Sequence, residues 1–183
     1  MKRIVWKFGT MAAGVLAVAL GGSMALRRAG WIDMDGSEVI GYSSMVLAFV
    51  LVFFGIRAYR DEVAGGAIGF GTAFGVGLLM SLIACAGYVA AWQVIYWGFY
   101  PDFLEEYSAE RLAQMRADGE PAAAIAAARA QMDRFAELYR NPLFNVGITF
   151  LEVFPVGLIM TAISAAILRR RPPAAAAAAR SAA

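Results

Sequence analysis

Four long apolar stretches dominate the chain, and Glu152 is the one charged residue inside them. The stretches are Phe8–Leu26, Val39–Ile56, the run between Glu62 and Asp102, and Pro142–Leu168. A bilayer core is roughly 30 Å thick, so about 20 apolar residues in a helix can cross it. The stretches therefore predict an all-α integral membrane bundle of four transmembrane helices. The expected spans cover about residues 4–26, 38–57, 70–98 and 143–168.

The composition fits one membrane domain over residues 1–171 and argues against several kinds of site. The net charge of +2 gives no case for nucleic-acid binding. Histidine is absent, which removes imidazole metal ligands and histidine-based catalysis. The one cysteine, Cys85, lies in an apolar run and is interpreted as a packing residue. We therefore predict no metal, no cofactor and no enzymatic activity.

Charged residues predict the orientation of the spans. Basic residues predominate before the first span and after the second and fourth, whereas segments 27–38 and 99–141 carry most of the acids. Positive residues in short flanks face the cytoplasm, so both termini are expected to be cytoplasmic. Arg27 and Arg28 oppose this assignment unless their side chains snorkel to the headgroups.

The first span has an alternative interpretation as a cleaved signal peptide. Basic residues precede an apolar run, and Ser23-Met24-Ala25 fits a small-x-small cleavage site. Cleavage there would leave three spans. The uncharged run continues to Leu26, which is long enough to span, so we expect the first span to be retained.

The segment between the third and fourth spans, residues 101–141, is polar, alanine-rich and charged. We expect an extracytoplasmic helical hairpin, with one helix to about Ala117, a break at Asp118–Pro121, and a second helix to Tyr139. Aromatic residues gather just before it and predict a belt at headgroup depth. These are Trp92, Tyr96, Trp97, Phe99 and Tyr100. Residues 172–183 predict a disordered cytoplasmic tail.

Glu152 is the strongest candidate for a functional or structural polar site. It lies about ten residues into the fourth span, near the bilayer midplane by helical rise. A carboxylate at that depth is costly unless paired, so we expect it to face the bundle interior. Its expected partners are Gln93, Tyr88 and Ser44, with Ser81, Cys85, Tyr42, Ser43 and Thr149 as further options.

Two interpretations of Glu152 stay open. One is a proton or cation relay, or the polar anchor of a substrate pocket. The other is a structural staple, in which the protonated acid makes an interhelical hydrogen bond. Pro155 removes one backbone hydrogen bond nearby and allows a local kink.

Two further patterns have mainly structural interpretations. Asp33, Asp35 and Glu38 resemble a short cation site, but a turn followed by a helix cap is the favoured interpretation. Gly71 and Gly75 have the four-residue spacing that lets helices approach closely. We expect these glycines to pack within the bundle, with a homo-oligomer interface as the alternative.

The central block carries a family resemblance. Gly41-Tyr42-Ser43-Ser44-Met45 opens the second span, and the pattern continues through Gly55-Ile56-Arg57-Ala58-Tyr59-Arg60-Asp61, Gly65-Gly66 and the glycine-rich run from Gly69 to Gly77. This block resembles a bacterial membrane protein family catalogued as domain of unknown function 4199. The resemblance covers about residues 4–170 and implies a bacterial inner-membrane protein. It implies no reaction and no catalytic residue.

Two functional hypotheses follow. The first is a non-enzymatic inner-membrane protein that assembles with itself or with a membrane partner protein, suggested by the small-residue helix faces and the outer hairpin. The second is a small transporter or channel subunit that uses Glu152. In both, the lipid bilayer is the expected surrounding.

Overall fold

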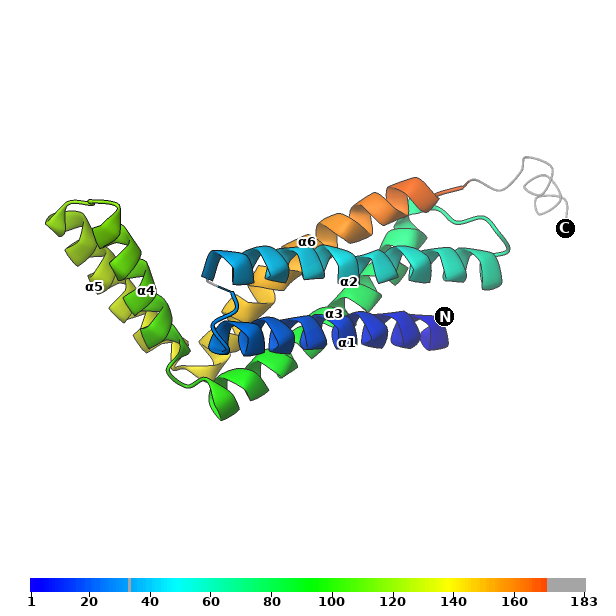
Figure 1. Cartoon of the computed structure of the whole chain (residues 1–183). Coiled ribbons are helices and arrows are strands. Elements are labelled where there is room, and N and C mark those ends of the chain that lie inside the picture. Colours follow the sequence, from blue (N-terminus) through cyan, green and yellow to red (C-terminus); the bar gives the residue numbers. More distant parts are fainter. Residues whose placement is uncertain (33, 171–183) are drawn as a thin grey trace, which may run out of the picture. The chain divides into compact units, whose positions relative to one another are not determined.

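The computed structural model describes residues 1–32 and 34–170, apart from the side chains of Met34, Asp35 and Glu38. Over these residues the chain is all-α and forms six helices (Figure 1). They are α1 (Lys2–Arg28), α2 (Met34–Glu62), α3 (Phe70–Phe99), α4 (Phe103–Ala117), α5 (Ala122–Tyr139) and α6 (Pro142–Leu168). The predicted fold class is confirmed. The predicted tail, residues 172–183, lies outside the described residues.

Four of these helices, α1, α2, α3 and α6, are long and apolar enough to cross a membrane. The bounds of α3 and α6 agree with the predicted spans to within one residue. Helix α2 is longer than expected because it continues through the charged residues Arg57 to Glu62. Hydropathy marks where the apolar surface ends, whereas the backbone hydrogen bonds of a helix continue into its polar end.

The chain divides into two compact units. Unit 1 combines Met1–Tyr88 with the described part of Glu152–Ala183, and unit 2 is Val89–Leu151. The boundaries between the units fall within α3 and α6, so each of these helices has one segment in unit 1 and another in unit 2. Each unit is therefore described by itself.

In unit 1, α1 and α3 approach each other closely at two glycines. A Cβ atom added to Gly9 of α1 would lie 2.9 Å from Cβ of Ile83. A Cβ atom added to Gly87 of α3 would lie 2.5 Å from Cβ of Ala13. Small residues at membrane helix interfaces allow such contacts between backbones. The approach of these two helices therefore requires glycine at both positions.

Helices α2, α3 and α6 meet at three more glycines of unit 1. A Cβ atom on Gly77 would lie 2.7 Å from Cδ1 of Ile56 and 2.9 Å from Cγ2 of Thr161. A Cβ atom on Gly157 would lie 2.7 Å from Cζ of Phe49, and one on Gly55 would meet Sδ of Met80. Helix α3 thus contacts α1, α2 and α6 within unit 1.

A buried hydroxyl pair adds a polar contact between α3 and α6. The side-chain oxygens of Ser81 and Thr161 are 2.8 Å apart, and both residues are fully buried. The Ser81 hydroxyl also lies 3.5 Å from the Gly157 carbonyl oxygen, a long contact. Either hydroxyl can be the donor in the short bond between Ser81 and Thr161. Both hydroxyl groups are satisfied inside the unit.

The predicted packing glycines, Gly71 and Gly75, lie elsewhere on α3. A Cβ atom at either position would meet nothing within 4 Å. Gly71 is exposed and Gly75 is half-buried. The close contacts described above therefore use other glycines of α3, and an interface between copies at Gly71 and Gly75 stays a prediction.

The turn between α2 and α3 pairs with the segment that follows α6. The Ile68 amide donates to the Arg170 carbonyl at 3.1 Å, and the Arg170 amide donates back at 2.9 Å. Gly65 and Gly66 have φ values of +66° and +87°, which suit glycine because it lacks Cβ. This pairing fixes the end of α6 beside the turn.

Unit 2 contains the predicted helical hairpin. Helices α4 and α5 lie side by side and are joined by a turn in which Gly119 has a φ of +76° (Figure 1). The break predicted at Asp118–Pro121 is confirmed. An exposed ion pair joins Arg140 to Glu105 at 3.8 Å. Exposed pairs of this kind contribute little to stability.

We expect the substitution Gly87→Ala to destabilise the protein by about 1–3 kcal/mol, because the new methyl group would overlap the Ala13 methyl group. Gly14→Ala is the matched control, since a Cβ at Gly14 meets nothing within 4 Å. Thermal unfolding of both variants in detergent measures the difference. Equal unfolding temperatures for the two variants would contradict the assigned contact.

Candidate functional site

Glu152 lies at the start of the α6 segment in unit 1, and its side chain is exposed on the surface of the chain. The next residue, Val153, is fully buried. The prediction that Glu152 faces the bundle interior is therefore corrected. Depth in the span was read from the sequence, but the face of the helix depends on which neighbours α6 packs against.

Tyr88 is a predicted partner that the structure places against Glu152. The Tyr88 hydroxyl donates to Oε1 of Glu152 at 3.4 Å, a long hydrogen bond, and the Tyr88 side chain is 6% exposed. The pair therefore joins a buried phenol on α3 to a carboxyl group at the surface of α6.

Ser44 makes a hydrogen bond within its own helix. Its hydroxyl donates to the Ile40 carbonyl one turn earlier in α2. Hydroxyl groups in membrane helices commonly bond back to their own helix in this way. Ser44 therefore satisfies its proton within α2.

Gln93 belongs to a directed chain of hydrogen bonds in unit 2. The Trp97 indole donates to Oε1 of Gln93 at 3.0 Å, and Nε2 of Gln93 donates to Oδ1 of Asn145 at 2.7 Å. An indole N–H can only donate, so it fixes the orientation of the Gln93 amide. That orientation in turn fixes the amide of Asn145.

Asn145 is the last residue in this series of hydrogen bonds, and its side chain has an unsatisfied donor. Its side chain is fully buried, and within the described part of the chain Nδ2 has no hydrogen-bond partner. Sequence analysis did not identify Asn145. Its position four residues before Thr149, with both on one helix face, was the available signal.

Two aromatic residues of the predicted belt, Trp92 and Tyr96, are instead buried in unit 2, at 6% and 4% exposure. The Trp92 indole donates to the Tyr139 hydroxyl at 2.7 Å. Tyr96 packs edge-to-face on Tyr139, with ring centroids 5.3 Å apart. These contacts connect α3 to the end of α5, while Trp97 and Phe99 stay exposed.

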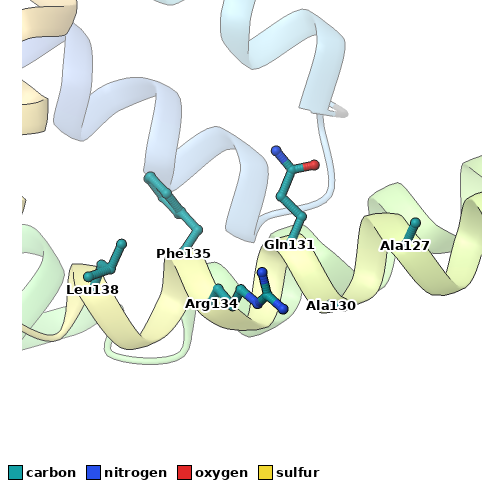
Figure 2. Close-up of a pocket in the computed structure, with 6 residues that line it drawn as sticks. All are labelled: Ala127, Ala130, Gln131, Arg134, Phe135 and Leu138. Atoms are coloured by element: carbon teal, nitrogen blue, oxygen red, sulfur yellow. The ribbon is translucent and has the colours of Figure 1, made fainter.

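A shallow hollow lies along α5 of unit 2. Figure 2 shows Gln131 and Phe135 projecting from the same side of this helix. The residues lining the hollow are Ala127, Ala130, Gln131, Arg134, Phe135 and Leu138. Phe135 is 38% exposed, and its ring lies 5.5 Å from that of buried Tyr139, measured between centroids.

Cys85 and the acidic residues Asp33, Asp35 and Glu38 were further predicted positions. Cys85 is fully buried, as expected of a packing residue. Among the described residues, no group of three or more His, Cys, Asp or Glu side chains could hold a metal ion. Asp33 and the side chains of Asp35 and Glu38 lie outside that part of the chain.

We expect Gln93→Leu to destabilise the protein by about 1–3 kcal/mol, because it leaves both polar atoms of buried Asn145 unpaired. Adding Asn145→Leu should recover part of that loss, since the stranded amide is removed. The unfolding free energies of the two single variants and the double variant measure the coupling between Gln93 and Asn145. Strictly additive effects would argue against the hydrogen-bond chain.

The comparisons with known proteins give a family and no activity. No curated protein and no solved structure gives a significant match to the chain. Residues 7–170 match the family described as Protein of unknown function (DUF4199). The match covers most of the chain, including all four candidate spans almost entirely. The chain is a multi-pass helical membrane protein and belongs to the DUF4199 family.

Proposed function

We propose that this protein acts by assembly in the membrane, through the face of α6 that carries Glu152. The action is non-enzymatic, in keeping with a sequence that lacks histidine. The observation that carries the proposal is the exposure of Glu152 within a helix long and apolar enough to span a bilayer.

The exposed face of α6 follows helical spacing from Glu152. Ile159 and Ile163 are 57% and 49% exposed, seven and eleven residues after Glu152. Residues at these intervals lie on one side of a helix. In an isolated chain this side would face lipid, so a carboxyl group would share a surface with isoleucines.

A carboxyl group against lipid hydrocarbon is unfavourable, because lipid tails offer it no hydrogen bonds. A neighbouring polypeptide removes the problem by supplying a polar contact and covering the isoleucines. Tyr88 supplies one hydrogen bond from within the chain. The partner we propose is a second copy or another membrane protein that covers the remaining surface of the carboxyl group.

We expect a cysteine at position 159 to cross-link chains in membranes, in a Cys85→Ser background. Val18→Cys is the matched control, because Val18 is 77% exposed on α1 of the same unit. Adding Glu152→Leu to Ile159→Cys should weaken association by about 5- to 30-fold, which corresponds to about 1–2 kcal/mol. Glu152→Gln should retain it, since the amide still makes hydrogen bonds.

Three results would contradict this assembly. Cross-linking could be equal at positions 159 and 18, which would indicate random collision. It could be insensitive to Glu152→Leu, which would separate the face from the carboxyl group. The purified protein could also be monomeric with no co-purifying membrane protein.

A transporter or channel subunit is the second candidate, because Tyr88 and Glu152 place two titratable groups together within candidate spans. The exposed position of Glu152 favours assembly over a conduit inside one chain. Proteoliposome flux separates the two: flux that depends on Glu152 supports transport, whereas flux unaffected by Glu152→Ala excludes this role.

The proposed location is a bacterial inner membrane, with both termini in the cytoplasm and the α4–α5 hairpin outside. In a Cys85→Ser background, Ala130→Cys on exposed α5 should react with a membrane-impermeant maleimide in cells with a permeabilised outer membrane. Val63→Cys, 48% exposed after α2, should react only after lysis of the inner membrane. The opposite labelling pattern would show that the termini lie outside and the α4–α5 hairpin lies in the cytoplasm.

A further inference from the structure

Basic residues from three helix ends converge at one end of unit 1. Helices α1 and α2 are consecutive, lie side by side and are joined by a short connection, so the start of α1 and the end of α2 share that end (Figure 1). The backbone pairing of Ile68 with Arg170 brings the end of α6 to the same place. The basic residues there are Lys2, Arg3, Lys7, Arg57, Arg60, Arg169 and Arg170.

Acidic residues at this end do not balance that charge. Asp61 binds Arg60 through both carboxylate oxygens, at 2.7 and 3.2 Å, and lies 3.8 Å from Arg57. The positive charge of Arg170 also acts on this carboxylate. Asp61 thus pairs with two guanidinium groups, those of Arg57 and Arg60, and Glu62 is the other acid among the described residues of these helix ends.

The excess positive charge is accessible. Arg169 and Arg170 are exposed, as are the basic residues at the start of α1. The neighbouring turn has little side-chain cover, because a Cβ atom at Gly65, Gly66 or Gly69 would meet nothing within 4 Å. A large anionic group can therefore reach the two arginines beside this turn.

The position along the helices identifies the anion. The charges lie at the ends of three candidate membrane spans, α1, α2 and α6, which is the depth expected of lipid phosphate groups. Basic clusters beside membrane helices attract anionic lipid headgroups. A soluble anion is not confined to the depth of the lipid headgroups, so this position favours a lipid phosphate over a soluble one.

We propose that this end of unit 1 binds the headgroup phosphate of anionic phospholipids, with Arg169 and Arg170 as the principal contacts. The backbone pairing with Ile68 holds Arg170 in place, the bond from the Arg169 amide to the Ala165 carbonyl holds Arg169 at the end of α6, and Asp61 pairs with Arg57 and Arg60 at the end of α2. This binding is independent of assembly through α6.

The test uses the full chain in zwitterionic detergent micelles, with phosphatidylglycerol or phosphatidylcholine added and bound lipid counted by native mass spectrometry. The wild-type protein should retain phosphatidylglycerol in preference to phosphatidylcholine. The double variant Arg169→Gln, Arg170→Gln should bind phosphatidylglycerol roughly 10- to 30-fold more weakly. Equimolar inorganic phosphate should not displace the lipid.

Two matched variants complete the experiment. Arg111→Gln with Arg116→Gln removes the same charge from exposed sites on α4 and should leave lipid binding unchanged. Arg169→Lys with Arg170→Lys keeps the charge and should preserve most of the binding. The proposal would be overturned if the two glutamine variants lost lipid binding equally. It would also be overturned if the wild-type protein did not prefer phosphatidylglycerol, or if inorganic phosphate displaced the lipid.

Discussion

Close approach between helix backbones is the interaction on which unit 1 depends. Lipid tails are as apolar as the side chains of the spans, so burial from water contributes little to the association of membrane helices. Short van der Waals contacts must then stabilise the packing. Glycines on α1, α2, α3 and α6 allow those contacts, and α3 takes part in most of them. The hydroxyl pair of Ser81 and Thr161 lies within the same packed region.

The spans could be predicted because their signal is local. About twenty consecutive apolar residues suffice to identify a span, and a Gly-Glu-Pro break suffices to separate α4 from α5. Contacts between helices are not local. Gly77 and Gly71 belong to the same glycine-rich run, yet Gly77 packs against Ile56 while Gly71 is exposed. Their positions around and along the axis of α3 distinguish them, and hydropathy does not encode which position meets a neighbouring helix.

The polar residues of the spans illustrate the same limit. Tyr88 could be proposed as a partner of Glu152 from the sequence, but the exposed position of Glu152 could not. Gln93 was recognised as a polar residue of α3, whereas its partner Asn145 was missed. A side chain's depth follows from its position in a span. Its partner depends on packing between segments distant in sequence, because each helix can turn any of its faces toward a neighbour.

The pairing of Ile68 with Arg170 has a topological consequence. It closes a loop of chain that contains α3, α4, α5 and α6 and returns to its starting point. The α4–α5 hairpin lies in the middle of this closed path. Insertions or deletions at the hairpin tip near Gly119 change the length of this path without changing the residues that pair at its two ends. The hairpin tip is thus a part of the closed path whose length the pairing of Ile68 with Arg170 does not fix.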